Sequence, residues 1–272
     1  MASVVRRSLL AAAVAALVNA EVPGGLTFHA SFETTDAAVA RGDRGIYSAP
    51  SYKEQSKAVP GLAQAPRVSL APGAGRNGSG ALRFSAKNEN AVFYRAADNV
   101  PFRPGNWTGT ISFFLRLDPD KDLEPGYCDP IQVTDSAYND SAIWVDFTRD
   151  DKPRHFRLGV FGELKSWNPN DVPADKNPAF LRRLTVVRRP PFAAGRWTHV
   201  LITHQGLGGG KGRATLYLDG RRMGFASGIG EVFEWNPDLA AIRLGVSYVG
   251  LMDDVMIFDR VLAEREILQL AR

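Results

Sequence analysis

The chain has 272 residues and a formal net charge of +4, from 33 Lys and Arg against 29 Asp and Glu. Its basic pairs, Arg182-Arg183 and Arg188-Arg189, form no stripe with interleaved aromatic residues, so binding to nucleic acid is not predicted. The single cysteine, Cys128, excludes an internal disulfide.

The first twenty residues have the pattern of a secretory signal peptide. Arg6 and Arg7 form a basic start, residues 8–18 are apolar, and residues 18–20 offer a cleavage site. The apolar run is shorter than the roughly 20 residues that span a bilayer. We therefore predict a signal peptide over 1–20 and a mature domain over 21–272 without a membrane span. The protein would be exported by the general secretory or twin-arginine route to the periplasm, the cell surface or the medium.

Apolar and polar residues alternate in short runs along most of the remaining chain. This period of two, broken by Gly, Pro, Asn and Asp, predicts strands over 26–33, 80–86, 110–117, 142–148, 155–162, 182–187, 197–204, 213–220, 241–246 and 253–259. Residues 263–271 are typical of a short amphipathic helix, which we expect to cover a sheet edge. The pattern indicates one all-β domain, a two-sheet antiparallel jelly-roll sandwich with a short C-terminal helix.

Turns and long loops separate these strands. The Gly-rich residues 206–212 and the pair Asp219-Gly220 are typical of hairpin connections. Residues 34–66, 118–141 and 163–180 read as irregular. Loops of this length in a compact β-domain are often binding loops.

Three loop aromatic residues are candidates for contact with a sugar: Trp167, Trp235 and Tyr138. Each has polar neighbours that could bind hydroxyl groups while the ring packs against the C–H face of a sugar. The alternative is that the loop tryptophans pack beneath their loops as a satellite core. Trp107, Trp144 and Trp197 lie in or beside strands and are expected in the core.

No catalytic motif stands out. A Glu-x-Asp-x-Glu run is absent from the sequence, Asp146 has no nearby Glu, and His199 and His204 are five positions apart on one strand and so face opposite sides. We therefore do not predict an enzyme.

The C-terminal third carries a recognisable set of motifs: RWTHV (196–200), LYLDG (216–220), IRLGV (242–246), GLMDDV (250–255) and EREIL (264–268). Together they resemble the laminin-G-like, concanavalin A-like jelly-roll domains of exported bacterial proteins. This resemblance implies a sandwich whose first and last strands are neighbours. Because the fold hosts many functions, three remain open: a non-catalytic module that binds a glycan, which we favour, a glycan-active hydrolase or lyase, and a structural or adhesive module that binds protein.

The resemblance also implies a structural calcium ion, which many relatives hold near the first and last strands. Asp253 shares a strand face with Val255 and should point inward. Calcium prefers oxygen ligands, and Glu33, Asp36 and Asp43 could complete its shell. Alternatively, Asp253 accepts hydrogen bonds from the backbone N–H groups of a neighbouring loop.

Overall fold

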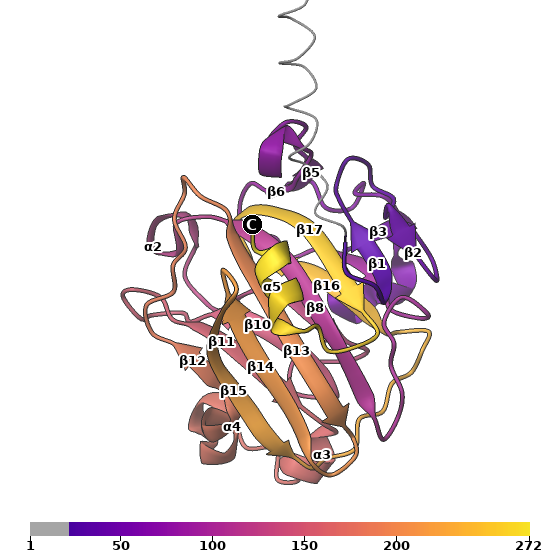
Figure 1. Ribbon diagram of the computed structural model, residues 1–272, viewed down its shortest axis with the longest axis vertical. Coiled ribbons are helices and arrows are strands. Elements are labelled where there is room, and N and C mark those ends of the chain that lie inside the picture. The colour runs from indigo at the N-terminus through magenta and orange to yellow at the C-terminus, as the bar shows by residue number, and fades with distance from the viewer. Residues whose placement is uncertain (1–21) are drawn as a thin grey trace, which may run out of the picture.

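The computed structural model describes residues 22–272, and the predicted signal peptide lies outside the described residues. The chain folds into two antiparallel sheets that pack face to face, with β13, β14 and β15 in front of β10, β11 and β12 in the view of Figure 1. No helix within residues 22–272 has the length and apolar character needed to cross a membrane.

The first sheet contains the N-terminal and C-terminal strands. Its order is β15 (Arg221–Ile229), β14 (Gly212–Leu218), β13 (Thr198–Leu207), β8 (Trp107–Arg116), β17 (Gly250–Phe258), β1 (Leu26–Ala30) and β2 (Val39–Ala40). Strand β6 (Leu82–Phe84) also pairs with β17, and β5 (Val68–Leu70) pairs with β6. Ala30 on β1 lies opposite Val255 on β17, so the first and last strands are neighbours, as the resemblance implied.

The second sheet has the order β12 (Thr185–Val187), β11 (Phe156–Phe161), β10 (Ala142–Phe147), β9 (Cys128–Thr134), β16 (Ala241–Val246), β7 (Ala91–Arg95), β3 (Ile46–Ala49) and β4 (Val59–Pro60). Strands β3 and β9 come from segments expected to be irregular. In β9, Pro130 lies at a bulge, where the register with β10 shifts between Val145 and Phe147.

Short helices connect the strands: η1 (Tyr52–Lys57), η2 (Arg76–Gly78), α2 (Pro119–Asp122), α3 (Leu164–Trp167), η3 (Ala174–Lys176), α4 (Pro178–Arg183) and α5 (Glu264–Leu270). The predicted strand 182–187 is therefore wrong in its first half. Asn177 caps α4 by accepting a hydrogen bond from the N–H of Ala179, and Pro178 suits its first turn. Helix α5 is confirmed, but its Ile267 packs on the outer face of the first sheet rather than on an edge.

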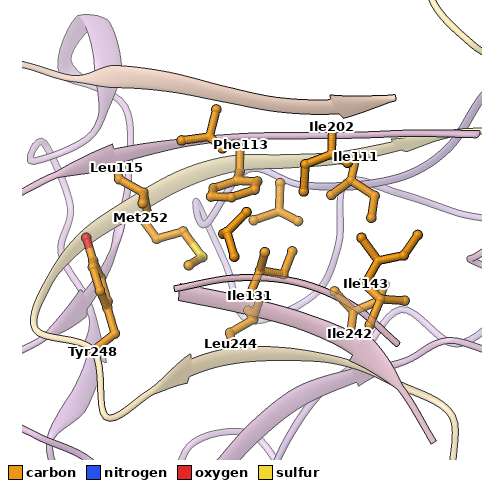
Figure 2. Close-up of a cluster of buried hydrophobic side chains, with 14 of the residues drawn as sticks. Ile111, Phe113, Leu115, Ile131, Ile143, Ile202, Ile242, Leu244, Tyr248 and Met252 are labelled. Carbon is orange, nitrogen blue, oxygen red and sulfur yellow. The ribbon is translucent and has the colours of Figure 1, made fainter. Parts of the chain in front are cut away.

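The main core fills the space between the sheets. Figure 2 shows Ile111, Phe113 and Leu115 of β8, with Ile202 and Met252, facing Ile131, Ile143, Ile242 and Leu244 of the second sheet. These side chains come from alternate positions, as the period of two predicted. The two-residue turn between β14 and β15 is also confirmed, since Asp219 and Gly220 both have positive φ, at 49° and 75°.

Candidate functional site

The outer face of β9, β10 and β11 is buried, although it lies on the side of the second sheet away from the main core. Every residue of these three strands is buried, whereas a sheet with one face in water would alternate. Part of the cover is a satellite cluster in which Trp167 of α3 and Phe180 of α4 pack on Trp144 and Phe161. Strand β11 has a glycine, Gly159, where a Cβ atom would come within 2.1 Å of the Trp144 ring. Gly159 thus lets this ring lie flat across the strand.

Beside this cluster lies a pocket of about 560 Å³, which we call the acidic pocket. Its size falls within the range of about 300–1,000 Å³ that is usual for small-molecule sites. The lining includes Tyr127, Asp129, Tyr138, Trp144, Asp146 and Arg157, together with residues 173–176. Four of these six side chains project from adjacent strands of the sheet, so a rigid scaffold positions them.

The two carboxyl groups in the acidic pocket have different partners. Arg157 on β11 binds Asp146 on β10 through both ends of its guanidinium, with 2.8 Å from Nε to Oδ1. This two-bond geometry is the favourable one for a buried Arg–Asp pair. Asp129 on β9 instead accepts a hydrogen bond of 2.5 Å from the side-chain amide of Gln132.

These surroundings change the protonation of both carboxyl groups. Burial, together with the nearby charge of Asp146, raises the pKa of Asp129 to about 8. Burial also raises the pKa of Asp146, although its hydrogen bonds with Arg157 act in the opposite direction. Asp129 therefore carries a proton at neutral pH and can donate a hydrogen bond into the pocket.

Aromatic rings form part of the remaining wall of the acidic pocket. The guanidinium of Arg157 lies 4.8 Å from the ring centroid of Tyr127, whose hydroxyl donates to Asp175 at 2.8 Å. Tyr138 meets Trp144 edge to face with 6.0 Å between ring centroids. Tyr138 is 38% exposed, so part of its ring is open to a ligand.

The two tryptophans predicted to contact a sugar anchor the loop that carries Tyr138. The indole N–H of Trp167 donates to the carbonyl of Asn139 at 2.9 Å, and that of Trp235 donates to the carbonyl of Ser141 at 2.7 Å. Trp167 is buried in the satellite cluster, which is the alternative considered from the sequence; as a direct ligand contact it is unsupported. Only Tyr138 of the three lines the acidic pocket.

Trp235 lines a different pocket of about 910 Å³. One side of its ring stacks on Phe102 at 4.1 Å between centroids, and it meets Trp107 edge to face. Trp107 lies in the main core as expected, whereas Trp144 lies in the satellite cluster. Contact between Trp235 and a ligand stays a prediction.

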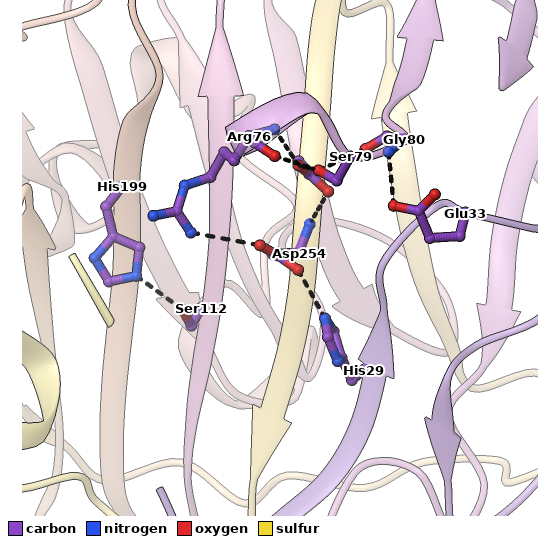
Figure 3. A network of polar contacts seen from close by, with 9 residues as sticks. His29, Glu33, Arg76, Ser79, Gly80, Ser112, His199 and Asp254 are labelled. Carbon is purple, nitrogen blue, oxygen red and sulfur yellow. Dashed lines mark hydrogen bonds and ion pairs between the residues drawn. The ribbon is translucent and has the colours of Figure 1, made fainter. Parts of the chain in front are cut away.

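Asp253, the first of the predicted metal ligands, is fully buried, but the prediction that it points into the main core is wrong. It lies opposite Phe114 on the outer face of the first sheet, because a bulge after Asp253 breaks the alternation with Val255. Its Oδ2 atom accepts hydrogen bonds from the N–H of Arg76 at 2.8 Å and the hydroxyl of Ser79 at 3.2 Å, and its Oδ1 atom accepts from the N–H of Asp254. Burial raises the pKa of Asp253 to about 6. Asp254 faces outward to His29 and Arg76, as Figure 3 shows.

Of the other three predicted metal ligands, two have partners of their own and one is exposed. Glu33 accepts a hydrogen bond from the N–H of Gly80 (Figure 3). Asp43 accepts hydrogen bonds from the N–H of Gly45 and the hydroxyl of Tyr47, and Asp36 is exposed. Within residues 22–272, no group of three or more His, Cys, Asp or Glu side chains is placed to hold a metal ion. The geometry therefore does not fit a calcium ion at these four residues, because N–H and O–H donors occupy the oxygens of Asp253.

The Asp253 anchor can be tested with two isosteric changes. We expect Asp253→Asn to lower the free energy of unfolding by about 2 kcal/mol, since the new amide turns a donor toward buried donors. Asp254→Asn is the matched control and should cost less than about 1 kcal/mol because its partners are partly exposed. Urea denaturation measures both, and equal losses would contradict the assignment.

Calcium binding at the four carboxylates can be tested directly. A ligand that binds only the folded state raises the melting temperature. Because the geometry does not fit calcium, we expect the melting temperature to be the same in millimolar calcium and in chelator, as measured by circular dichroism. A calcium-dependent rise that is lost in Asp253→Asn would restore the original prediction.

Asp129 should make the stability of the protein depend on pH. Its pKa rises on folding from the ordinary value of about 3.9 to about 8, so its stabilising contribution is complete below pH 4 and is lost as the pH rises through 8. Asn cannot ionise, and Asp129→Asn should therefore lose much less stability between pH 5 and pH 8 than the parent protein. Urea denaturation at several pH values measures the difference, and parallel profiles would argue against a buried, protonated Asp129.

Comparisons with known proteins agree with the architecture. Residues 131–268, half of the chain, match the family model of the concanavalin A-like lectin/glucanases superfamily. No curated protein sequence matches the chain.

Many solved structures have a similar fold, and two of them serve as examples. One is domain 4 of AbnA, an extracellular GH43 arabinanase from Geobacillus stearothermophilus, solved with arabinotriose; it aligns with a TM-score of 0.53 and 15% identity over 91% of this chain and 98% of that domain. The other is Trypanosoma rangeli sialidase, with a TM-score of 0.50 and 14% identity over 92% of this chain but only 33% of the sialidase. At such identities the likeness concerns the fold alone. With the family match, it places this chain in the concanavalin A-like lectin/glucanase superfamily.

Proposed function

We propose that this protein is a non-catalytic carbohydrate-binding module and that the acidic pocket holds the glycan. The observation that carries the proposal is the combination, in one pocket of about 560 Å³, of a partly exposed aromatic ring with buried polar groups on rigid strands. Carbohydrates need both, because a sugar ring has apolar C–H faces and a rim of hydroxyl groups. The predicted export from the cell suits such a module and belongs to the same proposal.

Different residues of the acidic pocket would contact different parts of a sugar. Tyr138 would pack against the C–H face of a sugar ring, as its exposed fraction allows. Protonated Asp129 can donate a hydrogen bond to a sugar oxygen, and the oxygens of Asp146 remain acceptors for a hydroxyl group. Because Arg157 and Gln132 already hold these carboxyl groups in place, binding costs little ordering.

The comparisons support the proposal at a coarse level. The matched superfamily is named after lectins and glucanases, and the structure of the arabinanase domain was solved with arabinotriose. Arabinan is therefore a reasonable first member of a ligand panel. The acidic pocket itself supplies the argument for this chain.

A glycan-active enzyme is the second candidate, and one observation favours it. Glycoside hydrolysis uses a protonated carboxylic acid beside an ionised carboxylate. Asp129, with its pKa of about 8, and Asp146, bound to Arg157, sit together in the acidic pocket. However, Asp146 is committed to two hydrogen bonds with a guanidinium, which makes it a poor nucleophile or base. Binding without reaction is the simpler reading.

Binding can be measured by retention of the purified protein on immobilised arabinan, xylan, galactan, β-glucan, cellulose and chitin. We expect retention on one glycan class, weakened about tenfold by Tyr138→Ala, the loss that about 1.4 kcal/mol of ring contact gives. Phe225→Ala is the matched control, because Phe225 is an aromatic residue of the first sheet that is 49% exposed. No retention on any glycan would overturn the proposal and favour a protein-binding module.

The same incubations separate binding from hydrolysis. A non-catalytic module releases no new reducing ends. Release that is abolished by Asp129→Asn, with retention preserved, would instead establish the enzyme.

A further inference from the structure

A second pocket adjoins the acidic pocket on the outer face of the second sheet. Its volume is about 460 Å³, and its lining includes Tyr52, Gln132, Tyr138 and Arg243. Tyr138 lines both pockets. In addition, Gln132 in the second pocket donates its hydrogen bond to Asp129 in the first. The two hollows are thus joined by one shared ring and one hydrogen bond.

The register of the sheet gives the direction in which the two pockets follow each other. Trp144 on β10 lies opposite Gln132 on β9, which lies opposite Arg243 on β16. Directly opposed residues share one face of a sheet, and neighbouring strands are about 4.8 Å apart, so this row spans about 10 Å across the strands. The acidic pocket extends it further, to Arg157 on β11.

Arg243 lines the second pocket, and the fold does not satisfy all of its hydrogen-bond donors. The side chain is only 4% exposed, yet its Nε atom has no hydrogen-bond partner among the described residues. Its Nη1 atom donates to the carbonyl of Ser136 at 2.9 Å, and its guanidinium lies 4.9 Å from the Tyr52 ring centroid. A buried guanidinium normally finds partners for its donors. Because Arg243 also lines the second pocket, the oxygen atoms of a ligand bound there would lie beside this guanidinium.

We propose that the two pockets form a single groove for an oligosaccharide, with one sugar unit in the acidic pocket and the following units against Tyr138 and Arg243. The inference rests on the proposed function and adds the ligand class: a glycan chain of several units rather than a single terminal sugar. Tyr138 lies at the junction, where both neighbouring units would touch its ring. Lys53, an exposed lysine of η1, also lines the second pocket and would contact the units farthest from Asp129.

The test is a length series. Oligosaccharides of one to six units are prepared from the glycan that retains the protein, beginning with α-1,5-arabino-oligosaccharides, and their affinities are measured by calorimetry. We expect the affinity to rise at least about tenfold between the disaccharide and the tetrasaccharide, which corresponds to about 1.4 kcal/mol. Lys53→Ala should remove most of this gain and leave the affinity for the disaccharide within about twofold of the parent protein. Arg243→Met should weaken the binding of every oligosaccharide of two or more units, because the second unit already lies against Arg243.

The matched control is Lys57→Ala, an exposed lysine of the same helix that lies outside the pocket lining. Lys53→Ala keeps the test decisive if Arg243→Met proves unstable, because Lys53 is on the surface. Retention on a glycan with the same affinity for two and four units would overturn the groove and leave the proposed function standing. A loss of the length-dependent gain in Lys57→Ala as large as in Lys53→Ala would also overturn it. If the protein is retained on none of the immobilised glycans, both the groove and the proposed function fail.

Discussion

Burial of the outer face of β9, β10 and β11 is the constraint on which the site depends. Charged groups on a covered face need partners, because an unpaired buried charge is costly. The sheet meets this need in two ways: Arg157 binds Asp146 through two hydrogen bonds, and Asp129 keeps its proton. The three side chains, of Asp129, Asp146 and Arg157, project from the adjacent strands β9, β10 and β11. The polar groups that the proposed ligand would meet are therefore fixed before binding, which would keep the entropic cost of binding low.

The same burial explains how a loop can present an exposed aromatic ring without being mobile. Residues 139–141 receive indole N–H bonds from Trp167 and Trp235, and Leu164 donates its N–H to the side chain of Asp140. Tyr138 precedes this anchored stretch. Trp167 and Trp235 would thus support the proposed ligand contact indirectly, by holding the loop that carries the Tyr138 ring.

The sequence allowed the architecture to be predicted because alternation depends on local burial, and strands such as β8 and β13 follow it cleanly. The same alternation did not predict β9, because Pro130 and the polar residues Asp129 and Gln132 interrupt the apolar pattern. The ion pair of Asp146 with Arg157 was not predicted, since the two residues become neighbours only through the register of β10 and β11. Parity predicted that Asp253 shares the inward face of Val255, but a bulge after Asp253 places it on the outer face. Its donors there, at residues 76 and 79, are more than 170 positions away in the sequence. Trp144 was expected in the core because no local pattern shows that residues 164–184 cover a second face.

The two outer faces of the sandwich differ in a way that decides where a ligand can bind. On the first sheet, α5 covers Leu201, Met256 and Phe258, and the guanidinium of Arg76 lies 3.6 Å above the centroid of the Phe114 ring. That ring face is already taken, and Asp254 holds the arginine in place. On the second sheet the cover of residues 164–184 stops short, so Tyr138 and the polar groups around Asp129 stay within reach. The fold by itself does not determine function. The length and position of one connecting segment leave the cover of the second sheet incomplete, and this opening is where the proposed ligand would bind.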